Sequence, residues 1–409
     1  MRRKYEVVLI GLAMLCTLIG CGRIREVKTE DKIVLTYMAP SYGNHSFVGK
    51  EAVENINKTY PDIEIHPVIF SEEQYYTVLK TRLATGKGPD FFFVQPEYAG
   101  PNGVSSLAEA GYLAPVTDLE GIKNADETKC ALIRHQDQVY SVSIGKMALG
   151  VLYNKTVFEE NGVTVPGCWE EFIECCETLK EKGIQPMTLG GKARNTYQYG
   201  LYQIAVNQIY PRDPGYDKEL REGTRKFTDK GTWDKVLTMY TGLYREGYMD
   251  PESMELTANE ARQKLENREA AMIFVSSGEA RNLVTGGAAN GDQYGMMPLP
   301  ANNAGEKTYW SIGETGGVGM YAGSAYPEEC KRVLENEFWK ELLDPEPRED
   351  RFLEEVNRAY GAGDYFYLCN QGWNNEVEIV MEKKLAEYIT GSRIQIRDIT
   401  RAMQEELER

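Results

Sequence analysis

Histidine is scarce in this chain, which holds only three: His45, His66 and His135. They lie far apart in the sequence, so a histidine-based metal centre is not expected. The eight cysteines include no C-x-x-C pair, and we expect neither a disulfide framework nor a zinc site. The sequence also lacks a G-x-S-x-G elbow, an H-E-x-x-H motif and a nucleotide-binding glycine loop. We therefore expect no metal and no cofactor.

Basic residues are in the minority, because 46 Lys and Arg face 62 Asp and Glu, and the net charge is −16 at pH 7. Such a charge keeps a protein soluble and argues against a nucleic-acid partner. After the N-terminal region, no stretch is apolar enough to cross a membrane. A length of 409 residues is too great for one hydrophobic core and predicts two domains or lobes.

The N-terminus has the pattern of an export signal. A basic start, Met1–Lys4, precedes the apolar run Val7–Ile19, whose roughly 13 residues are fewer than the about 20 that span a bilayer. The run leads to Leu-Ile-Gly before Cys21, which looks like a bacterial lipobox. We expect residues 1–20 to be a lipoprotein signal peptide, Cys21 to be lipidated, and residues 21–31 to form a tether. An ordinary secretory signal in which Cys21 is incidental is the alternative.

The first hundred residues after the tether alternate between strand and helix patterns. Ile33–Met38, Ile63–Ile69 and Phe91–Val94 are strand candidates with helical spacing between them. Ser71 opens the second helix with a pattern that resembles a capping box. This alternation predicts an α/β fold with a parallel sheet and crossover helices.

Ligands of such sheets bind beyond the carboxyl ends of the strands. Tyr42, Ser71, Gln95 and Glu97 follow the three strand candidates and therefore lie at that edge. Farther along the chain, Trp169 and Trp233 lie on regular apolar helical stripes, so both are expected in the core. From about residue 376 the tail has the pattern of a charged amphipathic helix or helix pair.

Six segments carry a resemblance to a known family: in chain order, Leu79–Asp90, Leu107–Leu113, Leu152–Lys155 with Pro166 and Trp169–Phe172, Glu269–Met272, Met297–Pro300 and Thr390–Gly391. Together they resemble the family 1 extracellular solute-binding proteins, which are receptors of carbohydrate ABC importers. Two positions depart from the family pattern. Cys168 replaces a threonine that usually caps a helix, and the region of Gly278 lacks a tryptophan that stacks on sugar in maltose-type members. The absence of that tryptophan puts a maltodextrin ligand in doubt.

The resemblance implies a two-lobed type II periplasmic-binding-protein fold with a hinge between the lobes. The first lobe is expected from residues 32–144 and 315–350, and the second from residues 145–314 and 351–409. The expected hinge segments lie near Ser143–Lys146, near Trp310–Glu314 and near residues 345–350.

A neutral sugar needs aromatic platforms for its C–H faces and planar polar groups for its hydroxyls. The resemblance places such residues at the sheet edge of the first lobe, on a loop of the second lobe, at a hinge crossing and near the C-terminus. The candidate ligand-binding residues are Tyr42, Gln95, Glu97, Asn195, Thr196, Tyr197, Trp310 and Trp373. For Glu97 a solvated carboxylate is an equal alternative. An iron site at Tyr75–Tyr76 is disfavoured, because Tyr75 lies on an apolar helical stripe.

The function that the resemblance implies is binding without chemistry. A monomeric, extracytoplasmic protein, lipid-anchored to the cell membrane, would capture a mono- or oligosaccharide and deliver it to ABC permease transmembrane subunits. A sugar phosphate stays open because Lys146 and Arg194 lie near the expected cleft, and a polyamine because Glu97, Glu279 and Glu314 do. A secreted glycoside hydrolase and a sugar sensor that signals to a membrane kinase are further alternatives.

Overall fold

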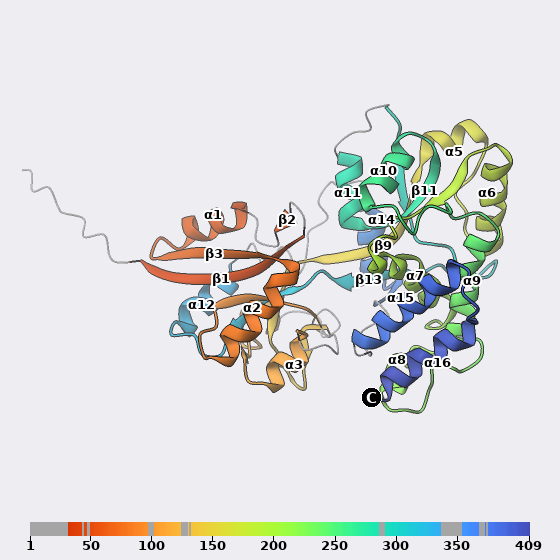
Figure 1. The fold of residues 1–409 in the computed structure, drawn as a ribbon. Coiled ribbons are helices and arrows are strands. Elements are labelled where there is room, and N and C mark those ends of the chain that lie inside the picture. Colours follow the sequence, from red (N-terminus) through yellow and green to blue (C-terminus); the bar gives the residue numbers. More distant parts are fainter. Residues whose placement is uncertain are drawn as a thin grey trace, which may run out of the picture.

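The protein consists of two α/β lobes that lie side by side, each built on its own sheet (Figure 1). The structure is a computed structural model and describes residues 32–42, 45–46, 50–96, 102–123, 130, 132–285, 291–336, 354–367, 373 and 375–409. The expected signal peptide, Cys21 and the tether lie outside these residues. Within the described ranges, no helix combines the length and the apolar character that a membrane span requires.

The sheet of the first lobe has a parallel half, as the sequence predicts. Strand β1 (Ile33–Tyr42) pairs in parallel with β3 (Ile63–Ser71) and with β4 (Phe91–Val94). Helices α1 (Lys50–Thr59) and α2 (Glu72–Ala84) provide the crossovers. All four residues of β4 are buried, as expected for an unbroken apolar strand. The other elements of this lobe are β2 (His45–Ser46), α3 (Val104–Glu109), β5 (Leu113–Ala114), α4 (Glu120–Lys123), β6 (Arg134–His135), β7 (Gln138–Val139), β8 (Ser141–Ser143), β14 (Gly317–Tyr321) and α12 (Pro327–Leu334).

The sheet of the second lobe is arranged around one long strand, β9 (Lys146–Asn154). Strands β11 (Ala270–Ser276), β12 (Tyr294–Met297) and β13 (Trp310–Glu314) all run antiparallel to β9. At the edges, β10 (Gln185–Thr188) is parallel to β11, and β15 (Tyr365–Tyr367) is parallel to β13. The helices around this sheet are α5 (Lys155–Asn161), α6 (Trp169–Glu181), α7 (Tyr197–Gln208), α8 (Tyr216–Arg221), α9 (Trp233–Arg245), α10 (Ala258–Glu266), α11 (Ser277–Thr285), α14 (Glu354–Ala362), α15 (Asn375–Ile389) and α16 (Ile396–Leu407).

The helix predictions hold with one correction. Helix α6 begins at Trp169, and the predicted tail is the helix pair α15 and α16, which lies at the lower front of the second lobe in Figure 1. Trp233 is fully buried, as predicted, and Trp169 is partly buried against the same core. Ser71 does precede α2, but its side chain makes no cap hydrogen bond, so the predicted capping box is wrong there.

The described cysteines contribute to the hydrophobic cores. Cys130, Cys168, Cys175, Cys176 and Cys330 are buried and free of disulfides. Cys175 and Cys176 lie on the inward face of α6, in the core of the second lobe. In this part of the chain, cysteine therefore behaves as a small apolar residue.

Two segments that join the lobes run side by side. The first crossing is Ile144–Gly145, between β8 and β9, and the second is Thr315–Gly316, between β13 and β14. The Ile144 amide donates to the Gly316 carbonyl over 3.1 Å, and the Thr315 amide donates to the Gly145 carbonyl over 2.8 Å. We call the resulting two-stranded unit, residues 141–149 paired with 311–319, the crossing ribbon. The hinge segment expected near residues 345–350 lies outside the described residues.

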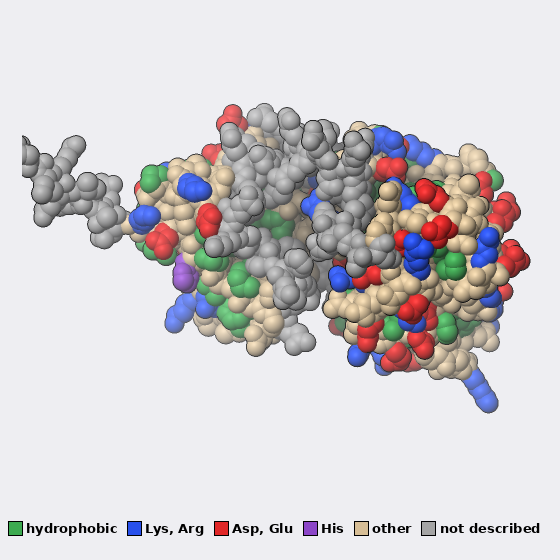
Figure 2. Space-filling view, turned by 90° about the horizontal axis from the view of Figure 1, so that it is seen from above, with side chains coloured by type: hydrophobic (Ala, Val, Ile, Leu, Met, Phe, Trp, Pro, Cys, Tyr) green, Lys and Arg blue, Asp and Glu red, His purple; other side chains and the backbone are tan. Residues whose placement is uncertain are grey.

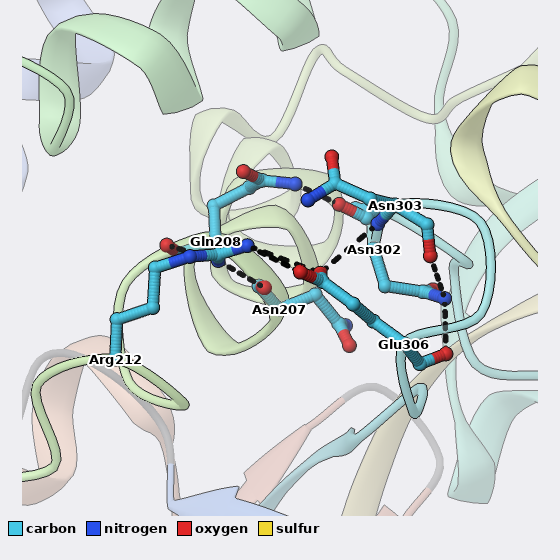
Figure 3. Close-up of polar contacts among 7 residues, drawn as sticks. Asn207, Gln208, Arg212, Asn302, Asn303 and Glu306 are labelled. Carbon is cyan, nitrogen blue, oxygen red and sulfur yellow. Dashed lines mark hydrogen bonds and ion pairs between the residues drawn. The ribbon is translucent and has the colours of Figure 1, made fainter.

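A polar network fixes the loop that precedes β13 to the end of α7 (Figure 3). Asn207 donates to the Tyr309 carbonyl over 3.0 Å and accepts from the Tyr309 amide over 2.8 Å. The Arg212 guanidinium donates to both carboxylate oxygens of Glu306, at 2.9 and 3.0 Å. Because these groups satisfy one another inside the second lobe, their role is to anchor a loop.

Candidate functional site

The strand directions bring the carboxyl ends of both sheets to the edges where the chain crosses between the lobes. In the first lobe β8 ends at the crossing and is antiparallel to β14, which in turn is antiparallel to β4. Strands β1, β3 and β4 therefore end at the crossing edge. In the second lobe β9 starts at the crossing, so its antiparallel neighbours β11 and β13, and β10 beside β11, end there. The region between the lobes is thus lined by strand ends from both sides, where α/β sheets bind ligands.

The first-lobe candidates are described only in part. Gln95 is half-buried at the end of β4, and its side-chain amide donates to the Tyr76 hydroxyl over 2.9 Å. For Tyr42 the structure describes the backbone at the end of β1 but not the side chain, and Glu97 lies outside the described residues. Tyr75 is fully buried, and its hydroxyl donates to the Phe93 carbonyl over 2.6 Å. Tyr75 is therefore a core residue whose hydroxyl is already used.

The three second-lobe candidates follow β10 along the chain and differ in their exposure to solvent. Asn195 is exposed. Thr196 is buried, and its hydroxyl donates to the Ala193 carbonyl over 2.8 Å, so it holds the loop together. Tyr197 is only 1% exposed and belongs to the second-lobe core. Asn195 is thus the member of this set whose side chain is open to a ligand in this structure.

The same loop forms one wall of a pocket of about 340 Å³ in the second lobe. The C-terminal half of α15 and Tyr197 also line this pocket. Three cationic side chains (Lys192, Arg194 and Lys383) line the pocket together with the carboxylates of Glu255 and Glu387. Glu387 is already paired with Lys384 at 3.0 Å, so the cations outweigh the available acids.

Both tryptophan candidates are buried in the second lobe. Trp373 is 0% exposed, with ring centres 4.9 Å from Trp233, 5.1 Å from Phe227 and 5.9 Å from Tyr202, so it packs in the core of the second lobe. Trp310 is 5% exposed and lies in a smaller core cluster with Ile312. In this structure neither ring presents a face on which a sugar could stack, because apolar neighbours cover it.

A group that the sequence did not predict lies at the second-lobe end of the crossing ribbon. The Lys146 ammonium is 3.2 Å from the Glu314 carboxylate and 4.4 Å from the centre of the Tyr360 ring. The rings of Tyr360 and Tyr365 stack at 5.2 Å, and Tyr367 lies 5.4 Å from Tyr365. Burial raises the pKa of Glu314, whereas Lys146 and Ser143 lower it. The closely spaced tyrosines in the sequence were the available signal, but 26 tyrosines in the chain obscured it.

Two acids on the inward face of α15 form a second buried group. Glu378 accepts a hydrogen bond from the Tyr202 hydroxyl at 2.7 Å, and Glu382, one helical turn later, is 8% exposed. Burial, and then the nearby Glu378, raise the pKa of Glu382 to about 8, while Arg194 lowers it. A raised pKa is also a property of catalytic acids, but these carboxyls are covered by core residues.

Among the described residues, no three His, Cys, Asp or Glu side chains converge as a metal site would require. On the face seen in Figure 2, acidic and basic side chains are interspersed over the second lobe, without a single-sign patch of the kind that binds nucleic acid.

The protein thus has two α/β lobes in which the strand ends of both sheets face a shared crossing. Residues 46–336 match the family described as bacterial extracellular solute-binding protein. The chain belongs to this family, as the sequence motifs indicated. It is therefore a binding protein and not an enzyme.

The individual relatives have low sequence identity to this chain. A multiple sugar-binding protein from Streptococcus mutans is 28% identical over 53% of this chain, and the match spans 50% of that protein. The melibiose/raffinose/stachyose-binding protein MelE from Bacillus subtilis is 20% identical over 81% of this chain and 76% of its own length.

Solved structures confirm the two-lobed α/β fold. A chitin oligosaccharide binding protein superposes with a TM-score of 0.73 at 20% identity and covers 92% of this chain and 98% of its own. A sugar transporter protein from Bacillus licheniformis, in complex with stachyose, has a TM-score of 0.68 at 17% identity, with coverage of 92% and 99%. At these identities the likeness concerns the fold.

Proposed function

We propose that this protein captures a mono- or oligosaccharide between its lobes and delivers it to the transmembrane subunits of an ABC permease. The observation that carries the proposal is the meeting of strand ends from both sheets at the crossing ribbon, in a chain of the solute-binding family. The sugars in the names of the Streptococcus and Bacillus relatives support a carbohydrate as the ligand.

The mechanism is capture by closure. A ligand that contacts both lobes stabilises the closed arrangement over the open one by its additional contacts. Gln95 on the first lobe and Asn195 on the second are polar groups suited to sugar hydroxyls, and Tyr42 and Glu97 remain proposed contacts of the first lobe. The protein works as a monomer in this proposal, and no bond in the ligand is made or broken.

A sugar phosphate is the second candidate ligand, and one observation favours it. Lys192, Arg194 and Lys383 line the pocket beside α15, and none of them forms an ion pair with another residue of the described chain. A phosphate group would be bound by such a set through charge-assisted hydrogen bonds.

A thermal-shift series on the purified protein tests the ligand class. We expect raffinose, stachyose or a chitin oligosaccharide to stabilise the protein, because a ligand at 100 times its Kd adds about 2.7 kcal/mol to the free energy of unfolding. Galactose, galactose 1-phosphate and spermidine complete the panel. A shift with the phosphorylated sugar alone would select the second candidate, and a shift with spermidine alone would refute a carbohydrate ligand.

A second experiment tests the membrane anchor. In cells that express the full chain, the wild-type protein should fractionate with membranes, because lipid chains on Cys21 would insert into the bilayer. The Cys21→Ser variant should lose the lipid, as seen by mass spectrometry, and leave the membrane fraction. If the variant stays in the membrane fraction and its mass differs from that of the wild type only by the exchange of sulfur for oxygen, lipidation at Cys21 is contradicted.

A further inference from the structure

The crossing ribbon carries a chain of polar contacts from one lobe to the other. The Ser143 hydroxyl, on β8 of the first-lobe sheet, donates a hydrogen bond to the Glu314 carboxylate. Glu314 lies on β13 of the second-lobe sheet, opposite Lys146 in the register, and forms the 3.2 Å ion pair with it. One carboxylate therefore contacts both sides of the crossing.

These contacts span the place where the ribbon can bend. The backbone φ angles are +125° at Gly145 and +152° at Gly316, in a region that only glycine adopts readily. Ser143 lies before this point and Lys146 after it, so bending the ribbon changes the distance between the two groups. A carboxylate that is hydrogen-bonded to Ser143 and ion-paired with Lys146 resists such a change.

Burial makes this arrangement energetically significant. Ser143 is 0% exposed and Glu314 is 4% exposed, so water cannot easily replace a lost partner. The Lys146 ammonium is also covered, and the Tyr360 ring contacts it. Removal of one member of a buried charged group leaves the others unsatisfied.

We propose that Glu314 is a positioning residue for the two lobes: its carboxylate ties Ser143 of the first lobe to Lys146 of the second and favours the lobe orientation of this structure over other orientations. Only one part of this inference rests on the proposed function, namely the expected effect of lobe orientation on ligand affinity.

The chain offers a matched pair of variants. Ser143→Ala removes the hydroxyl that reaches Glu314 and leaves the ion pair in place. It also removes the 3.2 Å hydrogen bond that this hydroxyl accepts from the Gly145 amide, a contact that the double variant K146M/E314Q retains. The control, Ser141→Ala, removes a hydroxyl from the same face of the same strand. Ser141 is also 0% exposed, but its hydroxyl has no hydrogen-bond partner among the described residues. Spin labels on unnatural amino acids at the exposed positions Lys80 on α2 and Lys182 after α6 report the distance between the lobes.

Pulsed EPR on the ligand-free protein should show the same distance distribution for the wild type and Ser141→Ala. In Ser143→Ala the population of the lobe orientation of this structure, relative to the other orientations, should fall about tenfold. This is the effect expected for the loss of one hydrogen bond to a charged group. Identical distributions for Ser143→Ala and Ser141→Ala would overturn the proposal. The double variant K146M/E314Q, which replaces the charges together, should reproduce the shift and provides an independent test if Ser143→Ala does not fold.

Affinity separates this inference from the proposed function. If stachyose binds, its Kd in Ser143→Ala should change with the population of the binding-competent orientation. An EPR shift without binding of any sugar in the panel would support the positioning role and refute the carbohydrate function. Sugar binding together with unchanged EPR distance distributions would support the carbohydrate function and refute the positioning role.

Discussion

Replacement of Trp373 by alanine is expected to lower the free energy of unfolding by about 3–5 kcal/mol, the range for a large aromatic residue removed from a core. The side chain is 0% exposed and meets three aromatic rings edge-on. Its loss would leave a cavity that Trp233, Phe227 and Tyr202 cannot fill without moving. Chemical denaturation followed by circular dichroism measures the effect.

A control variant separates this core role from a ligand platform. Trp169 is partly buried and stacks on Phe172 at 5.4 Å, so Trp169→Ala should cost less than Trp373→Ala. If Trp373 were a platform for sugar, its variant would keep the stability of the wild type and lose ligand affinity instead. That result would contradict the packing described for this residue.

Replacement of Glu382 by glutamine is expected to stabilise the protein at alkaline pH. Its pKa is about 8 in the folded protein against an ordinary value of 4.5. The folded state therefore holds this proton more tightly than the unfolded state, and its contribution to stability is complete below pH 4.5 and is lost as the pH rises through about 8. At pH 8 the loss is on the order of 4 kcal/mol. Glutamine avoids this loss because it does not ionise.

The measurement is a series of denaturation curves between pH 5 and pH 9. The gain in Glu382→Gln should be small near pH 5 and largest near pH 8 to 9. Glu378 is coupled to Glu382, so the transition belongs to the pair. Glu405→Gln, an exposed change on α16, should alter stability by less than about 0.5 kcal/mol at every pH. A Glu382→Gln curve parallel to the wild type across the range would refute the raised pKa.

Much of the fold could be predicted because its signals are local. The unbroken run Phe91–Val94 identified a strand buried on both faces, and the apolar stripe from Trp233 identified a core helix. The family motifs then supplied the two-lobed arrangement, which no local pattern contains.

The site was less predictable, because burial depends on distant parts of the chain. Trp373 has polar neighbours in sequence, yet α9 brings Trp233 against it and encloses it. Likewise, Lys146 and Tyr360 are far apart in sequence, and the pairing of β9 with β13 and the packing of α14 bring them together. Single-residue context could not reveal either contact.

The buried thiols have a consequence for a protein expected outside the cytoplasm. Burial raises the pKa of Cys175 and of Cys330 to about 12, so almost none of either is present as thiolate at neutral pH. Disulfide exchange requires the thiolate. Once folded, these cysteines are therefore inert toward oxidants, whereas the unfolded chain exposes them to wrong pairing. Rapid burial of α6 after export would thus protect the chain from misoxidation.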